Sequence, residues 1–248
     1  MTAIAVIPAR YASTRLPGKP LLRDTGKYLI QHVCERISQA RSLQGMIVAT
    51  DDERIAEAVR GFGGRAAMTR ADHVSGTDRV AEVAAGLDAD LIVNVQGDEP
   101  EIEPAAIDQL VGLLAAEPQV SMATLACPFA PTEDPANPNK VKVVLDRQGR
   151  ALYFSRALVP YPRDTQGRPT EALGSGWYLH LGIYAYRRDF LLRLAKMPPT
   201  PLEECERLEQ LRVLENGFEI AVGIVPQAAS GIDTPEDYAA FVRRLKGG

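Results

Sequence analysis

The sequence predicts an α/β fold, in which a largely parallel sheet carries helices on both faces. In the first half of the chain, short apolar runs of strand length alternate with stretches whose apolar residues recur at helical spacing. The composition is that of an ordinary globular protein, with 46% apolar and 24% charged residues in a chain of 248. These two observations exclude disordered, collagen-like and coiled-coil chains.

The alternating elements can be placed in order up to residue 125. Each expected strand is a short apolar run, and the strands are at 3–7, 46–49, 66–68, 91–95 and 120–125. Each expected helix has apolar residues three or four apart, and the helices are at 30–37, 55–62, 80–84 and 107–114. The glycine pair at 63–64 is a helix stop, and Pro104 is a good first-turn residue for the fourth helix.

The pattern changes after Cys127. Four prolines between 128 and 138 indicate a loop, and the runs 140–145 and 151–154 predict a hairpin. Residues 158–176, rich in Pro, Gly and charge, predict a mobile loop. The remaining elements are expected to be a strand at 180–186, helices at 188–196 and 202–215, a strand at 220–225 and a helix at 234–245. We expect one domain, with a core of residues 1–127, an insertion of residues 128–232 and a closing segment of residues 233–248.

Charge and cysteine content bound the function and the compartment. A net charge of −4 argues against a general nucleic-acid binder, yet the first 23 residues contain four cations and no acid. Such a local cationic patch favours a small anionic ligand. The three cysteines, at 34, 127 and 205, have no metal-ligand spacing and are odd in number, so we expect reduced thiols in a cytoplasmic protein. The chain shows no signal-peptide pattern and no apolar run long enough to span a membrane.

Two loops stand at expected strand ends, where ligands bind in doubly wound sheets. The first, residues 8–20, offers hydroxyls, backbone N–H groups and three cations, which suits a polyphosphate. It has neither the Walker A spacing nor the dinucleotide-binding glycine pattern. The alternative is a solvated loop whose charges aid solubility. The second loop, residues 94–100, places Asp98 just past the most apolar strand, where it is either a Mg²⁺ ligand or a turn acid before the next helix.

Several longer motifs resemble one enzyme family over nearly the whole chain. The segments are IPARYASTRLPGKPL, MTRADHVSGTDR, VNVQGDEP, VKVVLD, ALYFSRA, HLGIYAYR, LEQLRVLENG and GIDTPEDY, between residues 4 and 238. Together they are similar to the 3-deoxy-manno-octulosonate (KDO) cytidylyltransferases. The resemblance implies a nucleotidyltransferase-type, Rossmann-like mixed sheet with an inserted β-rich part for sugar binding and dimerisation. It also implies a cytoplasmic, Mg²⁺-dependent homodimer that joins CTP and KDO for lipopolysaccharide biosynthesis.

The resemblance also implies roles for individual residues. The triphosphate set is Ala9, Arg10, Ser13 and Lys19, and the cytidine set is Arg70, Ser75, Gly76 and Thr77. Asp98 and Asp233 resemble the Mg²⁺ carboxylates. The sugar-binding set is Gln96, Arg156, His180, Tyr184, Glu209 and Gln210. Arg10, Lys19 and Asp98 would carry the catalysis, and Arg156 has the planar donor fork that matches a sugar carboxylate.

Several of these residues have plainer structural alternatives. Asp233 precedes Thr234-Pro235, a combination that can simply open the last helix. His180 alone could be a hydrogen-bonded core histidine, although strand periodicity puts it on one face with Tyr184. Glu209 and Gln210 could be ordinary helix-surface residues. At the level of the whole protein, the alternatives are a transferase for a related acid sugar such as 8-amino KDO, a nucleotide-binding regulator without turnover, and a dehydrogenase.

Overall fold

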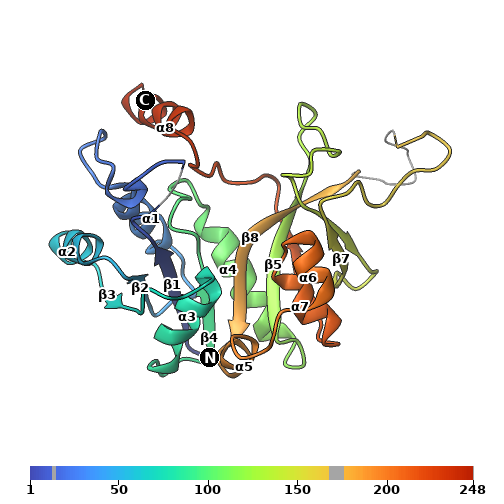
Figure 1. Ribbon diagram of the computed structural model, residues 1–248, viewed down its shortest axis with the longest axis horizontal. Helices are drawn as coiled ribbons and strands as arrows, with labels where there is room; N and C mark the ends of the chain where they lie inside the picture. The colour runs from blue at the N-terminus through green and yellow to red at the C-terminus, as the bar shows by residue number, and fades with distance from the viewer. Residues whose placement is uncertain (13–14, 168–175, 248) are drawn as a thin grey trace.

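The computed structural model describes residues 1–12, 15–167 and 176–247. These residues form one mixed sheet with helices on both faces (Figure 1). The strands are β1 (Ala3–Ala9), β2 (Gly45–Thr50), β3 (Ala66–Met68), β4 (Leu91–Asn94), β5 (Met122–Pro128), β6 (Lys142–Leu145), β7 (Ala151–Ser155), β8 (Tyr178–Arg187) and β9 (Ile220–Ile224). The predicted α/β class is therefore confirmed.

The helices alternate with the strands in the first half of the chain, as the apolar spacing predicts. They are the 3₁₀ turn η1 (Lys19–Leu21), α1 (Leu29–Ile37), α2 (Glu53–Gly61), α3 (Gly76–Ala85), α4 (Pro104–Ala116), α5 (Arg188–Leu194), α6 (Pro201–Glu206), α7 (Gln210–Glu215) and α8 (Pro235–Lys246). Pro104 opens α4 and Pro235 opens α8, each in the first turn. A proline costs little there because its missing N–H would have had no partner inside the helix.

The helix predicted over 202–215 is wrong in one respect, because the chain forms two helices there. Arg207 adopts the left-handed conformation, with φ 54° and ψ 48°, and ends α6. The break turns Leu208 inward, where it is 7% exposed. It also leaves the Glu206 carboxylate at the end of β7, where it accepts hydrogen bonds from Ser155 Oγ at 2.6 Å and Arg156 N at 2.9 Å. These tertiary contacts override the helical spacing.

Strand direction brings the important loops to one edge of the sheet. The strand order is β3-β2-β1-β4-β8-β5-β9, and β6 joins β8 and β7. The strands β1 to β4 run parallel to one another, as do β5 and β9, while β8 runs antiparallel to both of its neighbours β4 and β5. The carboxyl ends of β1 to β5 and β9 therefore lie at the same edge as the amino end of β8.

Two apolar layers pack on the opposite faces of the sheet. In β1, Ala3, Ala5 and Ile7 face the layer formed with α1, α2 and α4. The alternate residue Val6 faces the layer formed with α3, α5 and α7. This alternation follows from the period of two along a strand. A third, smaller cluster holds α8 against the start of α1 through Leu29 and Phe241.

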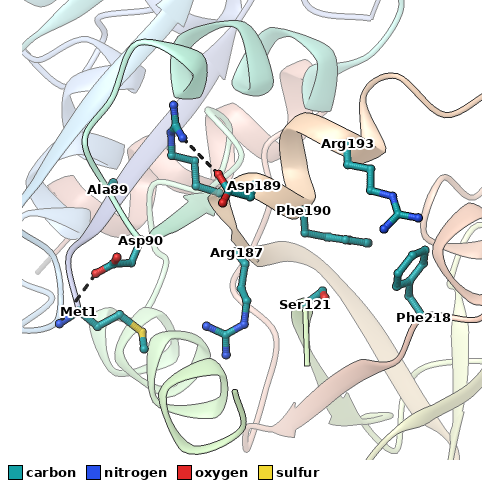
Figure 2. A pocket seen from close by; sticks show the side chains of 10 residues that line it. Met1, Ala89, Asp90, Ser121, Arg187, Asp189, Phe190, Arg193 and Phe218 are labelled. Carbon is teal, nitrogen blue, oxygen red and sulfur yellow. Dashed lines mark hydrogen bonds and ion pairs between the residues drawn. The ribbon is translucent and has the colours of Figure 1, made fainter. Parts of the chain in front are cut away.

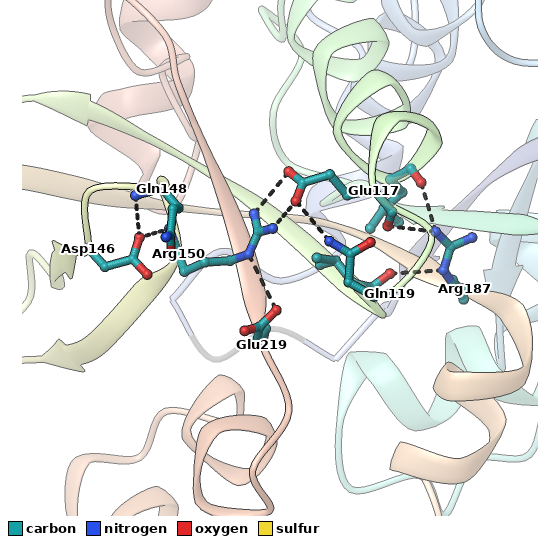
Figure 3. Close-up of polar contacts among 9 residues, drawn as sticks. Glu117, Gln119, Asp146, Gln148, Arg150, Arg187 and Glu219 are labelled. Carbon is teal, nitrogen blue, oxygen red and sulfur yellow. Dashed lines mark hydrogen bonds and ion pairs between the residues drawn. The ribbon is translucent and has the colours of Figure 1, made fainter.

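The opposite edge of the sheet is held together by arginines. A cavity of about 820 Å³ lies there, lined by Arg187, Arg193 and Phe218 among others (Figure 2). Arg187 donates to the carbonyls of Leu114, Glu117 and Val120, at 2.8, 3.0 and 2.9 Å, at the end of α4 and in the loop after it. In Figure 3 the same region carries Arg150, which pairs with Glu117 and lies 3.5 Å from a Glu219 carboxylate oxygen. These contacts tie α4 to both β8 and the β6–β7 hairpin.

The three cysteines are free thiols, as predicted, with Cys34 and Cys127 buried and Cys205 exposed. Among the helices of the described residues, none combines the length and the apolar character needed to cross a membrane. The loop expected over 158–176 falls partly outside the described residues, which omit 168–175. The division into a core, an insertion and a closing segment stays a prediction. In the structure, β8 from the expected insertion lies between β4 and β5 in the sheet.

Candidate active site

Residues from three distant segments meet at the edge of the sheet where the carboxyl ends lie. The Lys19 ammonium is 2.6 Å from Asp98 Oδ2 and 3.3 Å from Asp233 Oδ1. It also donates to the carbonyl of Ile232 at 2.8 Å. The side chain of Lys19 is only 13% exposed, against 30% for Asp98 and 49% for Asp233. The structure thus brings together the predicted triphosphate lysine and the two predicted metal carboxylates.

Local structure explains why Lys19 and Asp98 lie where they do. Gly18 precedes η1 in the left-handed conformation (φ 66°), and its N–H donates to Tyr11 O at 3.1 Å. A glycine is favoured there because side chains with a Cβ rarely adopt that conformation. Gly97 runs so close to β1 that an added Cβ would meet Pro8 O at 3.0 Å. This close approach sets the position of the neighbouring Asp98.

Asp233 is positioned by a backbone hydrogen bond of its neighbour Ile232 and by the cap of α8. The N–H of Ile232 donates to Asp98 O at 2.9 Å, which brings the two acidic segments side by side. Thr234 and Asp237 form a reciprocal capping box at the start of α8, and Asp233 N also donates to Asp237 Oδ2 at 3.1 Å. The interpretation of this segment as a helix opening is therefore confirmed, and the metal role of Asp233 stays a prediction. The helix start is a capped one, and it directs the preceding carboxylate toward Lys19.

Further cations surround this cluster. Arg15 reaches Asp233 Oδ1 at 3.2 Å and is largely exposed. Arg10 lies exposed immediately after β1, and Ala9 is buried as the last residue of that strand. Ser13, which the resemblance assigns to the triphosphate, lies outside the described residues. The loop therefore presents its positive charges at the edge where the acids meet.

The predicted cytidine segment borders the same edge. Ser75 caps α3, accepting a hydrogen bond from Asp78 N at 3.1 Å and receiving a reciprocal contact from the Asp78 carboxylate. Gly76 lies over Pro8, and Thr77 is buried in the first turn. Arg70 is exposed and pairs with Asp72 at 3.3 Å. Free N–H groups at a helix start favour polar or anionic groups of a ligand.

A polar cluster lies between this helix start and β8, and it includes Tyr184, Glu209 and Gln210. Tyr184 OH donates to Gln210 Oε1 at 3.4 Å, and the rings of His180 and Tyr184 are 5.6 Å apart. Hydroxyls of Thr77 and Ser75 face the Glu209 carboxylate and partly offset the burial that raises its pKa. The predicted shared face of His180 and Tyr184 is thus present. Gln96 is also nearby in the sheet, because its side chain donates to Gly182 O at 3.2 Å.

Burial sets the protonation of two groups near the cluster. His180 has its Nε2 3.0 Å from Thr124 Oγ1 and its ring edge-on to Phe154, and burial lowers the pKa of this imidazole to about 3. The imidazole is therefore neutral at physiological pH. Burial together with the charge of Asp98 raises the pKa of Glu99 to about 7. Glu99 was not singled out by the sequence analysis, although it adjoins Asp98.

Arg156 directly follows β7. Its guanidinium donates to the carbonyls of Glu206, Pro138 and Arg207, at 2.6, 3.0 and 3.4 Å. A guanidinium has five N–H donors, so two remain for a ligand. Behind it, the fully buried Lys142 donates to the carbonyls of Asn137, Lys140 and Arg156. Sequence reasoning missed Lys142, whose position in a short valine-rich run was the only signal.

The donor set at the cluster fits a hard divalent cation. Two carboxylates and one backbone carbonyl already converge on a single cationic group, the Lys19 ammonium. Mg²⁺ is usually held by one or two carboxylates and completed by substrate phosphates and water. Among the described residues, no group of three or more His, Cys, Asp or Glu side chains is placed to hold a metal by itself. Any Mg²⁺ here would therefore need oxygens from a ligand.

Comparisons with known proteins decide the family. The sequence model of the family described as cytidylyltransferase matches residues 4–220. Curated 3-deoxy-manno-octulosonate cytidylyltransferases are similar along the whole length. The protein from Syntrophotalea carbinolica is 51% identical, covering all of both chains, and that from Geobacter metallireducens is 55% identical, covering 99% of this chain and 98% of its own. The chain belongs to the 3-deoxy-manno-octulosonate cytidylyltransferase family.

Solved structures agree with this assignment. A CMP:2-keto-3-deoxy-manno-octonic acid synthetase determined in complex with CTP superposes with a TM-score of 0.92 at 44% identity, covering 100% of this chain and 99% of its own. A cytidylyltransferase from Leptospira borgpetersenii, 19% identical with a TM-score of 0.64, shares the fold; it covers 100% of this chain and 88% of its own. The predicted family and nucleotidyltransferase fold of this cytidylyltransferase are confirmed. The roles assigned to single residues stay predictions.

Proposed function

We propose that this cytidylyltransferase transfers CMP from CTP to the anomeric hydroxyl of KDO. The products are CMP-KDO, for lipopolysaccharide biosynthesis, and pyrophosphate. The observation that carries the proposal is the convergence of Lys19, Asp98 and Asp233 at one sheet edge. Full-length relatives about half identical to this chain carry the enzyme name, and a solved relative contains CTP.

The reaction joins two anions, so charge neutralisation and positioning dominate its barrier. The hydroxyl oxygen on C2 of KDO forms a bond to the α-phosphorus of CTP, and the hydroxyl proton passes to the solvent. The bond from that phosphorus to the bridging oxygen breaks, and its electron pair leaves with pyrophosphate. Arg10 and Lys19 are proposed to bind the triphosphate and to stabilise the charge on the departing pyrophosphate. No covalent intermediate on the protein is required.

Asp98 and Asp233 are proposed to hold Mg²⁺, with the Ile232 carbonyl close by. When bound there, Mg²⁺ would offset phosphate charge and lower the pKa of the attacking hydroxyl. The start of α3, with Ser75, Gly76 and Thr77, would bind the nucleoside together with Arg70. This assignment is supported by the position of α3 beside Pro8 at the end of β1.

The sugar acid is proposed to bind at the polar cluster of Tyr184, Glu209 and Gln210. Tyr184, Gln210 and Glu209 offer hydroxyl, amide and carboxylate groups that can bind sugar hydroxyls. His180, kept neutral by burial, can act as donor or acceptor without adding charge. Gln96 precedes Asp98 by two residues and donates to Gly182 O on β8. The two remaining N–H donors of Arg156 would bind the KDO carboxylate.

The decisive experiment measures pyrophosphate release. Purified protein receives CTP or UTP, with KDO present or absent, and with Mg²⁺ present or chelated. We expect release only when CTP, KDO and Mg²⁺ are present together. Release with 8-amino KDO but not with KDO would identify a related acid sugar as the substrate. No release under any of these conditions would refute the proposed activity.

We further propose a cytoplasmic homodimer. The three free thiols, two of them buried, suit a reducing compartment. Leu152 on β7 and Tyr161 after it are large apolar side chains that are 60% and 61% exposed, which suits a surface covered by a second copy. Sedimentation equilibrium should give twice the mass of the chain. A Leu152→Glu substitution should shift the mass toward that of one chain, and a monomeric wild-type protein would contradict the proposal.

A further inference from the structure

The Lys19 ammonium has no donor left over for a substrate. It carries three N–H groups, and three acceptors surround it, namely Asp98 Oδ2 at 2.6 Å, Ile232 O at 2.8 Å and Asp233 Oδ1 at 3.3 Å. All three acceptors belong to the protein. A lysine in this position neutralises the acidic cluster instead of facing a triphosphate. The ammonium cannot neutralise the acidic cluster and bind a triphosphate at the same time. It must therefore leave its protein acceptors before it can bind the triphosphate.

The acceptors of Lys19 are also the oxygens proposed to bind Mg²⁺. A Mg²⁺–carboxylate contact is about 2.0–2.1 Å long, so a metal on Asp98 would lie within a few ångströms of the ammonium. Two positive groups at that distance repel each other, and the Lys19 side chain, only 13% exposed, is partly shielded from water. The ammonium and the metal thus compete for one cluster, and only one of them can neutralise it at a time.

We propose that Lys19 is an exchangeable internal cation. It neutralises Asp98 and Asp233 until a metal ion replaces it there, and its ammonium then binds the triphosphate of the nucleotide. The inference rests on the proposed function, because it requires a triphosphate to receive the ammonium. Binding of the metal displaces Lys19 from Asp98 and Asp233, and binding of the triphosphate stabilises the displaced lysine. Metal and nucleotide therefore favour each other, and by linkage each raises the affinity of the other by the same factor.

The local structure allows the ammonium to move while the backbone stays in place. Lys19 is the first residue of η1, which Gly18 and Pro20 fix on either side. Its four-carbon stem has rotatable bonds throughout, so the charge can swing without unfolding the turn. Asp233 has a second partner in Arg15 at 3.2 Å, whereas Asp98 is paired with Lys19 at the shorter distance of 2.6 Å. The exchange is therefore centred on Asp98.

The test measures Mn²⁺ binding without nucleotide or sugar, by electron paramagnetic resonance of the free ion. Lys19→Met removes the competing cation and takes from Asp98 its charged partner, while Asp233 keeps Arg15. We expect the variant to bind Mn²⁺ at least about ten-fold more tightly than the wild type, which is the effect of losing one close like charge. Lys27→Met is the matched control, because Lys27 is a nearby lysine whose partner is the exposed Glu35 and not the cluster. It should bind Mn²⁺ as the wild type does.

Two further measurements make the outcome unambiguous. Adding Asp98→Asn to Lys19→Met should abolish the gain in Mn²⁺ affinity. That result would place the bound Mn²⁺ at the cluster. Mn²⁺ should also raise the melting temperature of Lys19→Met more than that of the wild type. If Lys19→Met does not fold, Lys19→Gln replaces it, since its amide carries no charge. Equal or weaker Mn²⁺ binding in the folded variant would overturn the inference. Because no substrate is used, this result is independent of the pyrophosphate-release experiment.

Discussion

At the scale of single residues, His180 shows how surroundings decide protonation. Burial lowers the pKa of its imidazole from 6.5 to about 3. The unfolded chain therefore binds a proton more readily than the folded protein between these two values. Its contribution to the unfolding free energy decreases as the pH falls through this window, by up to about 1.4 kcal/mol per pH unit.

We predict that His180→Gln flattens this part of the pH dependence. The comparison is made by urea unfolding of both proteins between about pH 7 and pH 5, above the range where most carboxylates titrate. The stability difference between them should shrink or reverse as the pH falls. Thr124→Val removes the hydroxyl beside His180 Nε2 but keeps the imidazole, so it should lower stability at every pH and retain the slope. Parallel curves for wild type and His180→Gln would disprove a buried neutral imidazole.

Asp98 is the residue whose charge matters most for the proposed chemistry. Asp98→Asn keeps size and shape and removes a metal ligand, so we expect turnover to fall at least about a hundred-fold, as for loss of a buried charged contact. The melting temperature should change little, because Asp233 and the Ile232 carbonyl still hold Lys19. Steady-state rates over a range of Mg²⁺ concentrations check this. Asp88→Asn, an exposed acid at the opposite edge of the sheet, is the control and should behave as wild type.

Sequence reasoning identifies residues that belong to long motifs and misses those that support them. Lys19, Asp98 and Asp233 are predicted because each lies in a rare segment, and the structure brings them together. Lys142 is missed because a lysine between valines in a short strand predicts a solvent-facing side chain. It is instead fully buried, since two backbone carbonyls from the loop before β6 and one after β7 surround its ammonium. Acceptors that come from distant parts of the chain cannot be predicted from the residues around Lys142.

At the scale of elements, α2 supports the loop that carries Lys19. The guanidinium of Arg54 lies 3.4 Å from the centre of the Tyr11 ring and pairs with Asp52, the N-cap of α2. On its other side Tyr11 contacts Gly18, where an added Cβ would lie 3.3 Å from the ring. The stack joins the helix to the residue just before η1. It therefore holds the backbone from which the Lys19 ammonium moves.

Arg54→Ala should loosen this loop without removing a ligand group. We predict a rise of about two- to five-fold in KM for CTP, the size expected for an exposed cation–π contact, and a smaller change in kcat. Initial rates at varied CTP and saturating KDO measure both constants. Arg60→Ala is the matched control, because Arg60 lies on the same helix and pairs with exposed Glu53. An unchanged KM in Arg54→Ala would show that the stack has no part in nucleotide binding.

The elements differ in how well a pattern predicts them. Strands and helices up to residue 125 follow from apolar spacing, because their apolar residues supply most of the two layers that cover the sheet. The break between α6 and α7 does not, since Arg207 in the left-handed conformation is not a glycine and gives no local stop signal. The break instead accompanies the hydrogen bonds that the Glu206 carboxylate accepts from Ser155 and Arg156 at the end of β7.

At the scale of the whole molecule, the site depends on strand order. The β8 strand lies antiparallel between β4 and β5, so His180 and Tyr184 reach the edge where Asp98 lies. The alternation of elements predicts a sheet with two covered faces, but it carries no information on which strand inserts where. The edge that gathers Lys19, Asp98 and Asp233 follows from the parallel direction of the neighbouring strands. The edge of the sheet that carries the site could therefore be predicted from the sequence, whereas the position of β8 between β4 and β5 could not.

Two neighbouring arginines hold the layers of the molecule together at the opposite edge. Arg187, at the end of β8, donates to three carbonyls at and after the end of α4, on one face of the sheet. Arg188 opens α5 and donates to Ala84 O and Ala85 O, each at 2.9 Å, at the end of α3 on the other face. Cations are favourable at helix carboxyl ends, where carbonyls lack partners inside the helix. The junction of β8 and α5 therefore links both helical layers.

Arg187→Met should accordingly destabilise the fold and spare the chemistry. Three carbonyls would lose a charged donor, which costs about 2–4 kcal/mol of unfolding free energy. Turnover at saturating substrates should stay within about two-fold of the wild-type value, because Arg187 lies at the edge of the sheet away from Asp98. Most molecules should also remain folded, since a domain of ordinary stability tolerates a loss of this size. Urea unfolding and initial rates provide the two measurements. Arg193→Met is the control, because Arg193 makes a single stacking contact with Phe218, and it should cost less than about 1 kcal/mol. Equal stability of Arg187→Met and wild type would mean that the layers hold together without this junction.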